Sequence, residues 1–246
     1  LGKSPVQLRV VQVKVFGIKF MNVSYKTRIL QIYRRLFDKY GPQYWWPGDT
    51  ALEIILGAIL TQATAWENAE KAINNLKHGC KLDLVALDDM ADNNMAGLLY
   101  PSVYFNVKTK KIKAFVRYVL ANYDGDLDGF LAKRLDVLRN ELLSIYGIGE
   151  ETADDIILYA AGQPSFVIDS YTRRILSRMG IYPAKETYRG YQELFVEALP
   201  DDAKLFGEFH ALIDEHASRT CHKTKPDCET CCLVEICSTG LSSVRG

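Results

Sequence analysis

The sequence predicts an all-α protein whose helices are joined by short loops. Apolar residues recur every three or four positions along most of the chain, which is the spacing of one face of an α-helix. Gly41-Pro42, Gly79 and Gly180 fall at the ends of such segments, where glycine and proline are expected to stop a helix. The alternating pattern of a strand is confined to the start of the chain.

The composition is that of an ordinary globular chain of 246 residues, 48% hydrophobic and 24% charged. Lys+Arg and Asp+Glu balance at 30 each, so contact with nucleic acid would have to come from a local basic patch. No apolar run is long enough to span a bilayer, and the first residues lack the pattern of a signal peptide. We therefore predict a cytoplasmic protein with no membrane partner.

The first two segments differ in character. Residues 1–20 are predicted to be an N-terminal extension, either a short strand or an extended arm, and no function is assigned to them. The segment that follows is helical, with an apolar face predicted from Leu30, Tyr33 and Phe37.

An aromatic loop containing Trp45 and Trp46 comes next. Adjacent tryptophans in a loop pack on the core or stack on a base, and the residues alone leave both open. The run Leu52–Leu60 is apolar nearly all round, which predicts a central buried helix. Thr61-Gln62-Ala63-Thr64 follows this run, and Gln62 by itself is expected to be a solvated polar residue at a helix end.

One cluster of basic residues has aromatic neighbours. It runs from Ser102 to Lys113 and contains Lys108, Lys110 and Lys111. The lysines either form a solvated helix face or contact phosphate.

Two glycines, Gly147 and Gly149, separate two amphipathic segments. Leu135, Leu138, Leu142 and Ile145 form one apolar stripe, and Ala153, Ile156, Ile157 and Ala160 form the other. Glycines one residue apart permit positive φ and leave backbone amides uncovered beside a helix N-terminus, which is a phosphate-binding geometry. A plain turn between two helices is the alternative.

Asp169 follows a short apolar run and precedes a helix predicted at Ser170–Met179. Aspartate is a favoured N-cap, so a capping role is expected. A carboxylate fixed at a helix end is also well placed to stabilise positive charge or activate water.

Five of the six cysteines crowd near the C-terminus. Cys221, Cys228, Cys231 and Cys237 have the spacing C-x6-C-x2-C-x5-C, which suits either zinc or a 4Fe–4S cube. Cys232 is adjacent to a ligand candidate and is expected to point away.

Taken together, these motifs resemble the helix-hairpin-helix DNA glycosylases of the endonuclease III type. The resemblance rests on G-I-G-x-x-T-A, on V-I-D ending at Asp169 and on the cysteine spacing, and it runs from about Tyr25 to Cys237. It implies two helical lobes with DNA between them, a 4Fe–4S cluster on the four cysteines and catalysis by Asp169. It places a helical barrel domain with the hairpin at 43–163, and a discontinuous cluster domain at 21–42 plus 164–246.

The resemblance also assigns DNA contacts. Gln62, in L-T-Q-A-T, would enter the gap left by the extruded base, and Tyr104 would wedge into the duplex. The backbone phosphate would lie on Gly147 and Gly149, with Thr152 and Lys108 included among the DNA-binding residues.

Glu151 stands where bifunctional members carry a lysine that attacks the sugar, and a carboxylate cannot form that imine. With the Trp45-Trp46-Pro47 loop, this resembles the 3-methyladenine DNA glycosylase III and methylpurine glycosylase branch, with Trp45 and Trp46 as pocket walls. We predict a monomeric, monofunctional DNA N-glycosylase for alkylated bases in double-stranded DNA. The alternatives are an endonuclease III-type enzyme for uracil, mismatched thymine or oxidised pyrimidines, and a non-catalytic DNA-binding protein.

Overall fold

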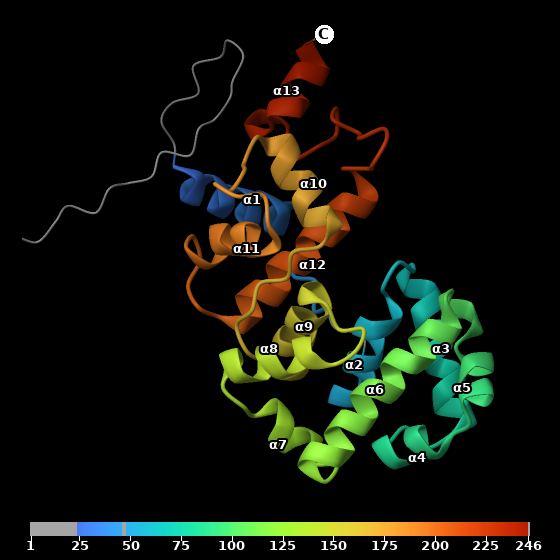
Figure 1. The fold of residues 1–246 in the computed structure, drawn as a ribbon. Coiled ribbons are helices and arrows are strands. Elements are labelled where there is room, and N and C mark those ends of the chain that lie inside the picture. Colours follow the sequence, from blue (N-terminus) through green and yellow to red (C-terminus); the bar gives the residue numbers. More distant parts are fainter. Residues whose placement is uncertain (1–23, 46–47, 246) are drawn as a thin grey trace, which may run out of the picture. The chain divides into compact units, whose positions relative to one another are not determined.

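The computed structural model describes residues 24–45 and 48–245 (Figure 1). These residues form α-helices with short 3₁₀ and π-helical segments, and no β-strand occurs among them. The all-α prediction is therefore confirmed. The strand or arm predicted at residues 1–20 lies outside the described residues, as does Trp46.

The chain divides into two compact units. The central unit comprises Tyr44–Val167 and Asp202–Glu208. The terminal unit comprises the residues up to Gln43 together with Ile168–Asp201 and Phe209–Gly246. The functional division into a barrel domain and a cluster domain, at the boundaries given above, stays a prediction.

The central unit is built around one buried helix. Eight of the ten residues of α2 (Ala51–Leu60) are buried, as predicted for this apolar segment. It packs against α3, α6, α9 and η2. The other helical elements of this unit are α3 (Trp66–Gly79), α4 (Leu84–Asp89), α5 (Asp92–Leu98), η1 (Tyr100–Ser102), α6 (Phe105–Tyr123), α7 (Leu127–Leu131), α8 (Leu135–Ser144), α9 (Glu150–Asp155) and the π-helical segment η2 (Ile156–Ala160).

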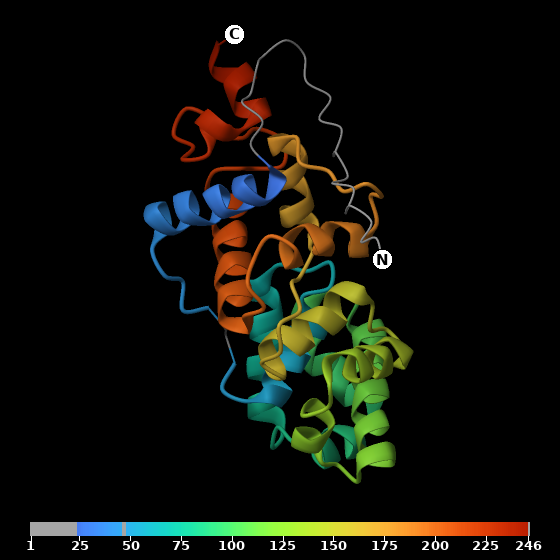
Figure 2. The ribbon, with the colours of Figure 1, turned by 90° about the vertical axis from the view of Figure 1, so that its left-hand side faces the viewer.

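The terminal unit gathers helices from both ends of the chain. They are α1 (Tyr25–Tyr40), α10 (Ser170–Met179), α11 (Tyr188–Val196), α12 (Ala203–Arg219, which begins in the central unit), η3 (Val234–Ile236) and α13 (Ser238–Arg245). Figure 2 shows α1 crossing α12, where the rings of Tyr33 and Phe209 meet edge to face at 5.2 Å between centroids.

The buried face of α1 is not the predicted one. Its fully buried residues are Ile29, Ile32 and Leu36, whereas Leu30, Tyr33 and Phe37 are only half-buried. The prediction was wrong by one position, because successive helical residues lie 100° apart and two adjacent apolar stripes compete for the core.

The helix α10 has the predicted bounds. Asp169 precedes it, and it ends at Gly180, whose φ of 68° is the left-handed conformation that commonly closes a helix. The buried run Phe166, Val167 and Ile168 leads into Asp169 and fixes where the helix begins.

Candidate active site and DNA interface

The loop at residues 145–149 joins α8 to α9 as a hairpin in the central unit. Gly147 has a φ of 87°, and a Cβ at this position would overlap the side chain of Lys111. Gly149 is the N-cap of α9 and supplies no side-chain cap to its amides. The loop therefore leaves backbone N–H groups at a helix start without a side-chain acceptor, which suits an anion.

The side chain of Gln62 is held against this hairpin. Its Nε2 donates to the carbonyl oxygen of Gly147 at 3.0 Å and to Oγ1 of Thr152 at 2.8 Å. Lys111 donates to its Oε1. The structure thus brings two predicted DNA-binding residues, Gln62 and Gly147, together. It also buries the Thr152 side chain against Gln62, and the DNA-binding role of Thr152 stays a prediction.

A second loop precedes α6 and carries Tyr104. The side chain of Tyr104 is 66% exposed, and that of Val103 beside it is 48% exposed. Both residues have positive φ, 57° at Val103 and 49° at Tyr104. An exposed apolar side chain on a tight loop is the arrangement that a duplex wedge requires.

Lys108 does not face solvent, and the predicted phosphate contact was wrong for this residue. It is 2% exposed, and its Nζ donates to the carbonyl oxygens of Leu60 at 2.7 Å and Ser102 at 2.5 Å and to Oγ1 of Thr64 at 2.6 Å. Burial lowers the pKa of Lys108 to about 8, and the charge of Lys111 acts in the same direction. The buried ammonium instead ties the end of α2 to the loop before α6.

An aromatic pair in the central unit includes Trp45, one of the two predicted walls of the base pocket. The rings of Trp45 and Tyr159 meet edge to face, with centroids 5.7 Å apart and an interplanar angle of 89°. Trp45 is 36% exposed. Tyr159 lies in the π-helical segment η2, a type of helical irregularity that is frequent at functional sites.

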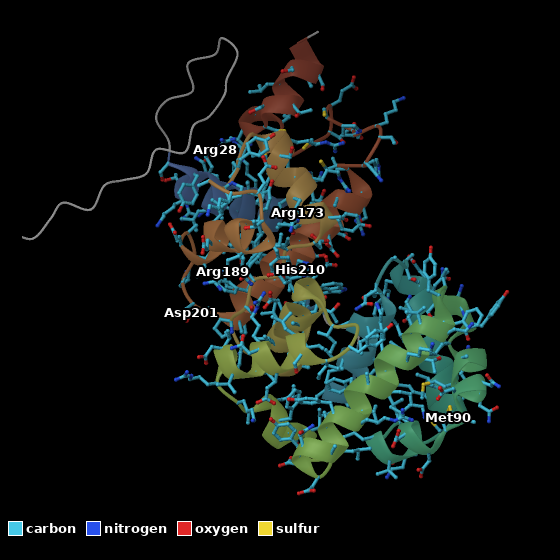
Figure 3. All side chains as sticks on the ribbon, in the orientation of Figure 1. Arg28, Met90, Arg173, Arg189, Asp201 and His210 are labelled. Atoms are coloured by element: carbon cyan, nitrogen blue, oxygen red, sulfur yellow. The ribbon has the colours of Figure 1, made fainter. Side chains whose placement is uncertain are left out.

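In the terminal unit, Asp169 caps α10. Its Oδ1 accepts a hydrogen bond from the backbone amide of Thr172 at 2.7 Å. Ligand atoms of Asp169, His210 and Asp214 all lie within 4.8 Å of one another. Figure 3 labels His210, which α12 contributes to this cluster. Burial lowers the pKa of His210, and the charge of Asp169 opposes that shift. The capping role predicted for Asp169 is present.

The four predicted ligand cysteines line a single cavity. They are Cys221, Cys228, Cys231 and Cys237, and Cys232 is absent from the lining. Burial raises the pKa of Cys231 to about 12, and the neighbouring cysteines add to the rise. Four cysteines gathered in this way ionise to thiolates when a metal cation balances their charge, so the donor set fits a metal centre.

Two arginines of α10 fasten the cysteine loop. Arg178 donates to Sγ of Cys221 at 2.9 Å and to the carbonyl oxygens of His222 and Lys223 at 2.8 and 2.9 Å. Arg174 donates to the carbonyl oxygen of Cys221 at 3.0 Å. The helix that Asp169 caps therefore also holds the loop that carries these cysteines.

The sequence did not single out Tyr159, His210 and Asp214, which lie beside the predicted site residues Trp45 and Asp169. His210 and Asp214 are four residues apart on one helix and so lie on the same face. This spacing could have identified them as a pair from the sequence. The residues around Tyr159 do not indicate its contact with Trp45, because Trp45 is far away in the sequence.

The sequence profile of the HhH-GPD superfamily base excision DNA repair proteins matches residues 56–201. The chain belongs to this family and is a DNA N-glycosylase. It is 42% identical over 211 residues to a Methanocaldococcus jannaschii protein named as a candidate DNA repair glycosylase. The matched residues make up 85% of this chain and 95% of that protein. Endonuclease III of Sulfolobus acidocaldarius is 30% identical over 52% of this chain and 58% of its own length.

Solved structures agree with this assignment. The 3-methyladenine DNA glycosylase MagIII of H. pylori, bound to 1,N6-ethenoadenine, matches with a TM-score of 0.68 and 25% identity over 80% of this chain and 98% of that one. A trapped endonuclease III–DNA covalent intermediate matches with a TM-score of 0.78 over 89% of this chain and 99% of that one. Its sequence identity is 16%, so this match supports a shared fold alone. Within the described part of the chain, no helix is long and apolar enough to cross a membrane.

Proposed function

We propose that the protein is a monofunctional glycosylase that hydrolyses the N-glycosidic bond of alkylated purines such as 3-methyladenine and 7-methylguanine. The observation that carries the choice of base is the aromatic pair of Trp45 and Tyr159. The likeness to MagIII, which is named as a 3-methyladenine glycosylase, supports it. Trp46, the other predicted wall, lies outside the described residues.

An alkylated purine of this kind carries positive charge on the base. Electron-rich aromatic faces attract such a cation by about 0.5–2 kcal/mol when the site is dry. The positive charge also activates the leaving group, so cleavage needs no strong general acid. Flipping the base out of the stack costs a few kcal/mol and least for a weakened pair, which adds selectivity.

The carboxylate of Asp169 acts on the sugar. It stabilises the oxocarbenium-like transition state or activates the attacking water, and its capping hydrogen bond from Thr172 holds it in one orientation. Positioning by a fixed cap reduces the entropy lost when the reacting groups come together.

DNA is held by the loops of the central unit. The amides around Gly147 and Gly149 bind a backbone phosphate, and Gln62 and Tyr104 occupy the duplex where the base has left. The enzyme acts as a monomer on double-stranded DNA. Glu151 has no amine, so the enzyme does not form an imine with the sugar and lacks lyase activity.

The four cysteines that line the cavity hold a 4Fe–4S cluster. The cluster supplies a rigid cross-link for the loop that presents Lys223 and Lys225. Iron and acid-labile sulfide in equal amounts, with broad visible absorbance, are expected of the purified protein, and a colourless zinc protein would contradict the assignment.

Replacing one ligand tests the structural role of this centre. Cys228→Ser is expected to lose iron and lower the thermal midpoint, because metal binding contributes folding free energy. Cys232→Ser is the matched control, since this neighbour is outside the cavity lining, and it is expected to keep its iron.

The choice of base is tested by chromatography of bases released from two duplexes, one methylated and one containing uracil. Release of 3-methyladenine or 7-methylguanine, with uracil left in place, is expected. Release of uracil alone would contradict the proposal.

The second candidate is removal of uracil or mismatched thymine. It is favoured by the likeness to endonuclease III. The same two duplexes separate the candidates.

A further inference from the structure

The backbone at Val103 is unusual for its residue type. Its φ of 57° and ψ of 153° lie in a region that only glycine enters readily. A β-branched residue pays the largest steric penalty there. Tyr104 follows with φ 49° and ψ 28°, so two successive residues with side chains have positive φ.

Hydrogen bonds on both sides hold this turn. The carbonyl oxygen of Ser102 accepts from Nζ of Lys108 and from Oγ1 of Thr64, each at 2.5 Å. The carbonyl oxygen of Tyr104 accepts from the amides of Val107 and Lys108 at 2.9 and 3.0 Å, which starts α6. The flanks therefore fix the strained conformation between them.

Packing does not compensate for the strain at Val103. Its side chain is about half exposed, so it gains little from burial in the protein itself. A strained conformation kept for an exposed apolar side chain indicates a role outside the fold.

We propose that Val103 is a second intercalating residue, which enters the duplex together with Tyr104. The two exposed apolar side chains are adjacent on a turn that the buried ammonium of Lys108 holds rigid. Apolar side chains inserted between base steps unstack them and stabilise the distorted duplex. The inference rests on the wedge role proposed for Tyr104 and is independent of which base is removed.

The test uses a duplex that contains a tetrahydrofuran abasic analogue and a neighbouring 2-aminopurine, whose fluorescence rises when it is unstacked. Val103→Ala is expected to weaken binding to this duplex about tenfold, the effect of removing two methyl groups from an apolar contact. It is also expected to reduce the fluorescence rise. Val85→Ala, at an exposed valine on α4, is the matched control and is expected to bind as the unmodified protein does.

A second pair of variants tests the strain. Val103→Gly is expected to be at least as stable to heat as the unmodified protein, whereas Val85→Gly, within a helix, is expected to be less stable. Normal binding and fluorescence with Val103→Ala would overturn the proposal, as would equal destabilisation by the two glycine variants.

The choice of probe separates this inference from the choice of base. If methylated bases are not released but the duplex with the abasic analogue still shows the Val103 effect, the proposed substrate is wrong and the wedge stands. If the unmodified protein does not unstack 2-aminopurine at all, the wedge is overturned.

Discussion

Two helix starts in this molecule have nearly the same backbone and different chemistry. Gly149 precedes α9 with φ −94° and ψ −178°, and Asp169 precedes α10 with φ −95° and ψ −175°. Asp169 accepts a hydrogen bond from the third residue of its helix, whereas Gly149 has no side chain with which to do so. The backbone conformation is therefore common to both, and the side chain decides what each helix start can bind.

One backbone geometry thus serves two purposes in this molecule. Without a side-chain cap, the first amides of α9 remain suited to a phosphate oxygen. At α10, the cap satisfies an amide and at the same time presents a fixed carboxylate. We expect the first helix start to bind DNA and the second to act on the sugar.

The largest effect is expected from Asp169→Asn. Asparagine caps a helix about as well as aspartate, so the fold and DNA binding should be kept. The charge that stabilises the transition state is lost, and single-turnover base release should fall by about 10²–10⁴-fold.

The control for this variant is Asp83→Asn. Asp83 caps α4 by accepting from the amide of Ala86 at 2.8 Å, so the same chemical change is made at a cap far along the chain. It should release base at the normal rate. Undiminished release by Asp169→Asn would show that the carboxylate at this cap is not catalytic.

An intermediate effect is expected from Gly149→Asp, which makes the first helix start resemble the second. The position has space for a side chain and an ordinary φ, so the carboxylate can cap α9. The variant should be as stable or more stable, yet bind DNA about tenfold more weakly, because the carboxylate occupies the phosphate site and repels phosphate.

Gly149→Ala serves as the comparison at the same site, since it adds a Cβ without a competing acceptor. The DNA-binding constant K should be titrated at several salt concentrations. For the aspartate variant only, the slope of log K against log salt should be smaller in magnitude by about 1 than for the unmodified protein. Equal affinities of the two variants would argue against a phosphate at this hairpin.

How far the sequence predicts these features depends on whether the cause is local. The buried helix α2, the hairpin glycines and the cap at Asp169 each follow from neighbouring residues, and the structure has them as expected. The shared cavity of the four cysteines also follows from their spacing.

Features that depend on distant residues were not predictable in the same way. Lys108 looked like a surface lysine, but it is buried among three acceptors, from Leu60 at the end of α2, Thr64 just after it and Ser102 in η1. Tyr159 pairs with Trp45, which is distant in the sequence, and the strain at Val103 arises because hydrogen bonds on both sides fix the turn. Long-range pairing of this kind leaves no periodic pattern in the sequence.

The smallest effect on stability is expected from Glu151→Lys. Glu150 and Glu151 lie in the first turn of α9, where negative charge is favourable, so the substitution should lower the free energy of unfolding by about 0.3–1 kcal/mol. The new amine stands where an imine with the sugar is expected to form, and borohydride should then trap the variant on DNA containing an abasic site.

The unmodified protein should give no trapped product, and neither should Glu150→Lys, which moves the same charge by one residue around the helix. Trapping of the unmodified protein would mean that another lysine attacks the sugar, and the monofunctional assignment would then be wrong. Trapping of both lysine variants would show that any amine at this helix start suffices. Trapping of Glu151→Lys alone would show that the uncapped start of α9 directs position 151, and not 150, at the sugar.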